Sequence, residues 1–165
     1  MSPVETVIEE FRDGSAGRWR VLTDQVMGGI SEGAAQVQDC DGQRCLRLTG
    51  TVSTANNGGF VQARLELATR WPATARGVLL TVRGNGERYF CHLRSTATRR
   101  PWQHYRAGFE SHADWRAVAL PFNAFSAAGG ALPVPVPPAE VTSVALVAYG
   151  RDHEADVSLA RIALY

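Results

Sequence analysis

Side chains that can bind a polar ligand alternate with apolar side chains in two stretches of the sequence. In residues 60–67 the apolar positions are Val61, Ala63, Leu65 and Leu67, and the alternate positions are Phe60, Gln62, Arg64 and Glu66. In residues 83–94 the corresponding polar and aromatic positions include Arg83, Phe90, His92 and Arg94. Successive side chains of a β-strand point to opposite faces of its sheet. Each stretch therefore predicts one apolar face and one polar face.

A cationic patch follows if these strands lie in one sheet. The predicted ligand-binding residues are Gln62, Arg64, Arg83, Phe90, His92 and Arg94, together with Tyr105, whose strand phase the pattern leaves open. Planar guanidinium donors beside an aromatic ring suit a carbohydrate, a carboxylate-bearing ligand or an acidic protein segment. The alternative is a solvated outer face on which arginine stems cover apolar surface.

Two further segments combine paired glycines with short polar side chains. The predicted loop-structuring residues are Asp24, Gly28, Gly29 and Ser31 in the first segment, and Asn56, Asn57, Gly58 and Gly59 in the second. For Asp24 we expect an acceptor role that fixes its loop, the alternatives being a catalytic carboxylate or a metal ligand. For the asparagines we expect left-handed turn positions, with sugar binding as the alternative. The two loops are expected to pack on each other and to border the binding face.

Patterns typical of enzymes and metal sites are weak in this chain. The four histidines, at positions 92, 104, 112 and 153, are too scattered to indicate zinc ligation. The acidic turn at 152–156 is expected to be solvated, with a structural calcium left open. No serine lies in a nucleophile elbow, and no poised carboxylate pair for glycoside hydrolysis is evident. The expectation is a protein without catalytic residues, metal or cofactor.

The elements that must position these residues are short alternating segments separated by turn signals. The expected strands are residues 6–11, 31–38, 44–49, 60–67, 77–83, 88–94, 104–109, 115–120, 143–148 and 156–164. Residues 84–87 (GNGE) predict a tight connection that pairs strands 77–83 and 88–94 as a hairpin. Residues 131–138 are predicted to be a loop, because their four prolines cannot donate in a sheet ladder. The pattern predicts an all-β fold, a two-sheet jelly-roll sandwich that spans residues 1–165 as a single domain.

Four blocks of the sequence resemble, in order, the complex I intermediate-associated protein 30 family. The first block holds Trp19 and residues 24–31 (DQVMGGIS), and the second runs from Gly50 to Phe60 and ends in NNGGF. The third is residues 83–89 (RGNGERY), with Asn85 where the family more usually has aspartate. The fourth runs from Tyr105 to Phe125. The resemblance covers nearly the whole chain and implies a galactose-binding-like jelly-roll domain.

The resemblance also implies a binding protein without catalytic activity. The best-known members of that family help to assemble respiratory complex I in mitochondria, and similar domains occur in bacteria and plants. We therefore expect a non-catalytic module that binds a protein partner in an assembly or scaffolding role. The alternative is a carbohydrate-binding module that holds a small polar ligand such as a sugar on a concave arginine and aromatic face. No transit peptide is visible, which favours a free-standing bacterial protein.

The composition limits the classes of binding partner and the cellular compartment that we expect. The formal net charge is only +1, and the apolar runs are short, so neither nucleic-acid binding nor membrane insertion is expected. The chain has three cysteines, which suits a reducing cytoplasm. Cys40 and Cys45 flank a predicted hairpin turn and are expected to be reduced thiols, although a disulfide between them is geometrically conceivable.

Overall fold

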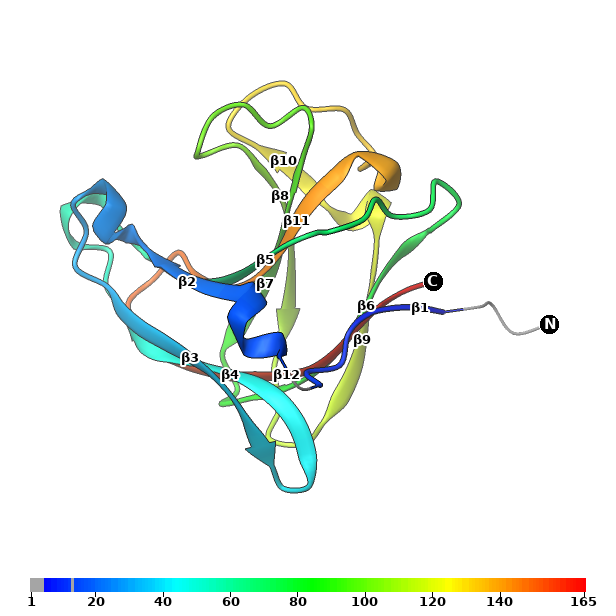
Figure 1. Cartoon of the computed structure of the whole chain (residues 1–165). Helices are drawn as coiled ribbons and strands as arrows, with labels where there is room; N and C mark the ends of the chain where they lie inside the picture. The colour runs from blue at the N-terminus through cyan, green and yellow to red at the C-terminus, as the bar shows by residue number, and fades with distance from the viewer. Residues whose placement is uncertain (1–4, 13) are drawn as a thin grey trace.

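The chain folds into two β-sheets, whose strands Figure 1 labels. Alternating apolar side chains of both sheets form one hydrophobic core. The computed structural model describes residues 5–12 and 14–165. Sheet A contains β1 (Thr6–Glu9), β3 (Glu32–Cys40), β4 (Gln43–Val52), β6 (Gly77–Gly84), β9 (Arg116–Pro121) and β12 (His153–Leu164). Sheet B contains β2 (Trp19–Thr23), β5 (Phe60–Glu66), β7 (Arg88–Ser95), β8 (His104–Glu110), β10 (Ser126–Ala128) and β11 (Val141–Tyr149).

All the strand pairs within these sheets are antiparallel. The order in sheet A is β3-β4-β12-β6-β9, with β1 also paired to β12, and the order in sheet B is β10-β8-β7-β11-β5-β2. Short 3₁₀ turns are η1 (Ser15–Arg18), η2 (Asp24–Met27), η3 (Ala55–Asn57), η4 (Phe122–Ala124) and η5 (Pro138–Glu140). In residues 5–12 and 14–165, no helix has the length and apolar character needed to span a membrane. The architecture is the predicted all-β sandwich of two antiparallel sheets.

The alternation predicted within individual strands is confirmed. Sheet A contributes Val78, Leu80 and Val82 to the core, and sheet B contributes Val61, Ala63, Leu65, Tyr89, Cys91 and Leu93. All of these side chains are at most 4% exposed. Burial of such side chains typically stabilises a fold by about 1.5–3 kcal/mol each. The polar positions between those of β5 and β7 consequently lie on the outer face of sheet B.

The predicted hairpin between residues 77–83 and 88–94 is wrong. β6 pairs with β12 and β9, whereas β7 pairs with β11 and β8, so residues 84–87 cross from one sheet to the other. Asn85 ties the crossing to both sheets. Its side-chain Nδ2 donates to the Glu154 carbonyl at 2.9 Å, and the Tyr89 hydroxyl donates to its Oδ1 at 2.5 Å. Both strands turn their apolar faces to the same core, but from opposite sides.

Long-range pairing also adds two strands that local patterns did not predict. β2 pairs with β5, and the three-residue β10 pairs with β8, at the two edges of sheet B. In β12 a bulge between Leu159 and Arg161 changes the strand phase. As a result Ile162 and Leu164 join Val157 and Leu159 in the core, and Arg161 stays at the surface.

The expectation of reduced thiols at the β3–β4 turn is also wrong. Cys40 and Cys45 form a disulfide across the turn, which contains Asp41 and Gly42. β3 and β4 stay paired as far as Cys40 and Gln43, next to the turn. This register brings Cys40 and Cys45 close together. Cys91 is a buried free thiol in the core.

Candidate functional site

One row of outward side chains crosses the middle of sheet B. Antiparallel pairing places Ala145 of β11 opposite Arg64 of β5 and also opposite His92 of β7. His92 in turn lies opposite Arg106 of β8. The row brings three nitrogen-rich side chains onto one face, with a small alanine between two of them.

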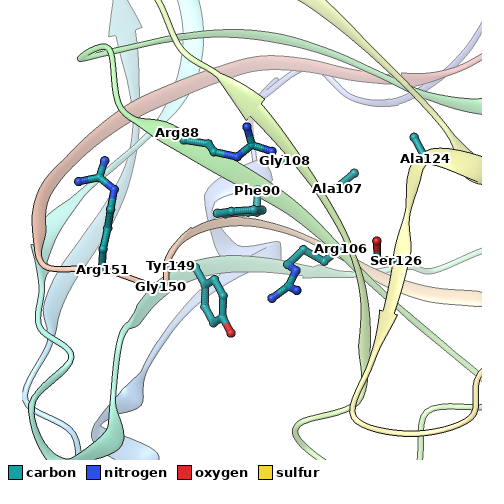
Figure 2. A pocket seen from close by; sticks show the side chains of 10 residues that line it. All are labelled: Arg88, Phe90, Arg106, Ala107, Gly108, Ala124, Ser126, Tyr149, Gly150 and Arg151. Carbon is teal, nitrogen blue, oxygen red and sulfur yellow. The ribbon is translucent and has the colours of Figure 1, made fainter.

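The neighbouring row has a glycine, and therefore no side chain, at its position in β8. Phe90 lies opposite Val147 of β11 on one side and Gly108 of β8 on the other. The Arg88 side chain occupies the space above Gly108, since a Cβ added there would stand 2.5 Å from an Arg88 nitrogen. A pocket of about 550 Å³ opens at this point, with Arg88, Phe90, Arg106 and Tyr149 among its lining residues (Figure 2).

Two aromatic rings form a corner inside this pocket. Phe90 and Tyr149 meet edge to face, with ring centroids 5.7 Å apart and an interplanar angle of 86°. Each ring also carries a guanidinium group. Arg88 lies 5.6 Å from the Phe90 centroid and Arg106 lies 5.3 Å from the Tyr149 centroid. Such a corner offers a ring face for stacking and planar donors beside it.

The three arginines around the pocket differ in their partners. Arg88 pairs with Glu110 at 3.2 Å, and Arg151 forms an ion pair with Glu87. For Arg106, the described part of the chain offers neither an ion pair nor a side-chain hydrogen bond. Arg106 is therefore the cation of this pocket whose donors are available to a ligand.

A pair of stacked histidines adjoins the pocket. The His92 and His104 rings lie 4.1 Å apart with an interplanar angle of 15°. The Nδ1–H of His104 donates to the Trp102 carbonyl at 3.0 Å, and the Nε2 atoms of both histidines are buried without a hydrogen-bond partner in the described structure. Burial lowers the pKa of His92 well below its ordinary value, and nearby positive groups lower it further. Burial also lowers the pKa of His104, so the neutral form of both rings predominates at pH 7.

Arg94 holds a loop at the edge of the same face. Its guanidinium group donates to the backbone carbonyls of Arg100, Pro101 and Gln103 at 3.2, 3.1 and 2.8 Å. Trp102, in the same loop, is 59% exposed. Arg94 thus fixes the loop that presents this tryptophan.

The structure brings together five of the seven residues predicted to bind ligand. Gln62, Arg64, Phe90, His92 and Arg94 all lie on the outer face of sheet B. Their ligand binding stays a prediction.

Two of the seven lie elsewhere. Arg83 belongs to β6 in sheet A, where it pairs with Asp41 at 2.8 Å and lies over the Trp115 ring. Its predicted place in the patch is wrong because β6 and β7 do not share a sheet. Tyr105 is fully buried, and its hydroxyl donates to the Pro133 carbonyl at 2.6 Å. The Tyr105 side chain therefore points into the core and does not belong to the patch.

Sequence reasoning missed Tyr149 and Arg106. A usable signal was present for both. Tyr149 continues the outward series of β11 at positions 143, 145 and 147, and Arg106 lies two residues after His104 in β8. Their convergence on Phe90 depends on the pairing of β7 with both neighbours, which local alternation does not specify.

The two glycine-rich loops are held together by one buried carboxylate. Asp24 is fully buried and accepts hydrogen bonds from the Ser31 amide at 2.9 Å, the Ser31 hydroxyl at 2.5 Å and the Gly59 amide at 2.6 Å. Burial raises the pKa of Asp24, but these hydrogen bonds outweigh that effect and leave the pKa below its ordinary value. A Cβ at either Gly29 or Gly58 would overlap the Asp24 side chain. The carboxylate and the glycines thus fit one another sterically.

The asparagine loop has the turn geometry that its sequence indicates. Asn56 and Asn57 adopt φ values of 57° and 60°, in the left-handed region. The Asn56 side chain donates to the Gly28 carbonyl at 3.3 Å, which adds a second link between the loops. Gly28 and Gly59 have φ values of 87° and 133°. The loops pack on each other, as the sequence predicts, whereas their position at the border of a binding face stays a prediction.

The acidic turn after β11 does not gather its side chains. Asp152 accepts hydrogen bonds from the amide and hydroxyl of Thr54, whereas Asp156 pairs with Arg47. Within residues 5–12 and 14–165, no cluster of three or more histidine, cysteine, aspartate or glutamate side chains is placed to hold a metal ion.

Comparisons with known proteins agree on the family and the fold. Residues 9–160 match the sequence model of the family "Complex I intermediate-associated protein 30 (CIA30)". No curated protein matches the sequence closely enough to count as a relative.

Several carbohydrate-binding modules of Clostridium thermocellum share the fold. A family 11 module in complex with a β-1,3-1,4-mixed-linked tetrasaccharide has a TM-score of 0.76 at 13% identity, with 99% of this chain and 96% of that chain covered. A family 30 module has a TM-score of 0.69 at 14% identity, with 99% and 98% covered. At these identities the likeness establishes the jelly-roll fold alone.

Proposed function

This chain belongs to the complex I intermediate-associated protein 30 family, and on that premise we propose that it is a non-catalytic module that binds carbohydrate on the outer face of sheet B. The observation that carries the proposal is the pocket of about 550 Å³ with its Phe90–Tyr149 corner. A sugar ring presents apolar C–H faces and polar hydroxyl edges. An aromatic corner flanked by arginines complements both.

The shape and lining of the pocket support a binding role. Its wall combines the two aromatic rings with guanidinium donors from Arg88 and Arg106 and the hydroxyl of Ser126. Small-molecule sites commonly join apolar walls to a few polar groups that fix orientation. The family 11 module that resembles this fold was solved with a tetrasaccharide, which is further support for a glycan ligand.

The same lining argues against hydrolysis of the bound sugar. Most glycosidases flank the scissile bond with two carboxyl groups. The residues that line this pocket include no aspartate or glutamate, and Glu110 and Glu87 are paired with its arginines Arg88 and Arg151. A non-catalytic role therefore fits the lining better.

A second candidate function is the binding of a protein partner in an assembly role. The loop fixed by Asp24 exposes Val26, Met27 and Ile30 to 72%, 61% and 54%. Three exposed apolar side chains on a loop pinned at its base are typical of a protein contact. This candidate uses a different surface from the pocket and is tested separately.

A glycan array probed with the wild-type protein and with Tyr149→Ala separates the two candidates. The carbohydrate proposal predicts saturable binding that Tyr149→Ala weakens and that Met27→Ser leaves unchanged. A protein partner recovered from lysate by wild type and Tyr149→Ala but not by Met27→Ser, with no glycan bound on the array, would overturn it in favour of the assembly role.

A further inference from the structure

We propose that the ligand of this face is an acidic glycan, in which a sugar ring lies in the Phe90–Tyr149 corner and a ring carboxylate pairs with Arg106. The inference rests on the proposed carbohydrate site and deepens it by naming the chemical class of the sugar. Three observations carry it: the unpaired state of Arg106, the excess of cations on the face and the geometry of the corner.

Arg106 is positioned for an anion that the described residues do not supply. Its guanidinium carbon lies 5.3 Å from the Tyr149 ring centroid, and Figure 2 shows the two side chains next to each other in the pocket. Arg88 and Arg151, the other arginines of the pocket, already have carboxylate partners in Glu110 and Glu87. A planar guanidinium group with free N–H donors recognises a carboxylate through two parallel hydrogen bonds.

Positive groups crowd the same face of sheet B. Arg64 lies in the row that contains Arg106, and burial together with the charge of Arg94 lowers its pKa. Glu66 lies 4.0 Å from Arg64 but also 3.6 Å from Arg20, so this one carboxylate is shared by two arginines. The neutral histidine pair adds no negative charge. An anionic ligand would relieve this repulsion, whereas a neutral sugar would not.

The geometry of the aromatic corner suits a ligand whose carboxylate lies close to its stacked sugar ring. Phe90 and Arg106 belong to adjacent strands, in neighbouring rows of the outer face. In a uronic acid the carboxylate is attached directly to the pyranose ring. A ring seated against Phe90 and Tyr149 therefore places its carboxylate within the reach of an arginine side chain. A long flexible acidic peptide would not need the aromatic corner.

Calorimetry with matched oligosaccharides tests the inference. The ligands are a galacturonic acid tetrasaccharide, its fully methyl-esterified form, and the neutral mixed-linked β-glucan tetrasaccharide. Esterification keeps the ring and removes the charge. The acid is expected to bind at least about tenfold more tightly than its ester, and its affinity is expected to fall as sodium chloride rises from about 0.05 to 0.5 M.

Variants assign the effect to Arg106. Arg106→Gln is expected to lower affinity for the acid at least about tenfold and to leave affinity for the ester nearly unchanged, while Arg106→Lys gives an intermediate loss. Arg116→Gln is the control, because it removes the same charge from sheet A, where Arg116 lies on β9 and pairs with Asp114. It should bind as wild type. Thermal unfolding confirms that each variant is folded.

The outcomes separate this inference from the proposed function. Equal affinity for acid and ester, both weakened by Tyr149→Ala, would overturn the acidic-glycan inference and leave the carbohydrate site standing. Binding of poly-glutamate with the same dependence on Arg106, and no binding of any sugar, would overturn both and assign the face to an acidic protein segment.

Discussion

The guanidinium group of Arg106 lies over the ring of Tyr149, with 5.3 Å between the guanidinium carbon and the ring centroid. The two residues come from β8 and β11, which are separated by β7. Their contact therefore spans three strands. It links the aromatic part of the pocket to its unpaired cation.

Tyr149→Ala should weaken glycan binding by about tenfold or more, because the substitution removes one wall of the aromatic corner. Tyr149→Phe keeps the ring and should bind within a factor of about three of wild type. Calorimetric titration measures both. Equal binding by the alanine variant and wild type would show that the sugar does not contact this ring.

Asp24→Asn should destabilise the fold by about 3 kcal/mol, since an amide cannot accept all the hydrogen bonds that Ser31 and Gly59 donate to the buried carboxylate. Urea unfolding measures the change. Asp152→Asn is the control, because Asp152 also accepts two hydrogen bonds but lies exposed at the surface. Its effect should be much smaller, and equal losses in both variants would contradict the role assigned to Asp24.

Stability should fall as pH decreases below about 6.5, the ordinary pKa of histidine. The buried imidazole of His92 has a pKa well below this value. Between the two pKa values the unfolded chain binds a proton that the folded protein does not, so the free energy of unfolding rises with pH across this window. One such histidine contributes a slope of up to about 1.4 kcal/mol per pH unit.

His92→Gln should flatten that slope, as measured by urea unfolding at several pH values between about 5 and 7. The His104 pKa is also lowered, so part of the slope remains in this variant. Asp24 contributes to the pH dependence only in a more acidic range, because its pKa lies below its ordinary 3.8. A slope unchanged by His92→Gln would show that His92 stays accessible to protons in the folded state.

Replacing both Cys40 and Cys45 by serine should cost about 2 kcal/mol of stability, because their disulfide closes only a short loop. Thiol labelling of the denatured, unreduced protein should detect one free cysteine, Cys91. In the folded protein Cys91 should resist labelling, since burial raises the pKa of its thiol to about 12. Labelling of all three cysteines without reductant would contradict the disulfide.

The sequence was a good guide to which face of each strand is buried. Alternation in β5 and β7 correctly placed Arg64 and His92 on the outside, because burial of the intervening apolar residues fixes the strand phase. The glycine-rich loops were also predictable. Gly28 has no Cβ atom, and Asn56 has a short polar side chain, so both positions tolerate the positive φ values observed there.

Local sequence patterns did not predict which strands pair with each other. The short connection at Asn85 has the composition of a hairpin turn, yet it crosses between sheets because Asn85 and Tyr89 are bound to the backbone of β12. Because the connection crosses between the sheets, Arg83 lies in sheet A and not beside β7 in sheet B. The pocket itself depends on β7 lying between β8 and β11, a non-local pairing that no segment of the sequence specifies alone.

A backbone-amide NMR titration with the galacturonic acid tetrasaccharide tests the central claim most directly, because it locates the ligand on the fold. The account predicts the largest shift changes at Phe90, Gly108 and Gly150 around the pocket, and little change at the Asp24 loop or in β3 and β4. Changes confined to residues 26–30, or spread over the outer face of sheet A, would contradict it.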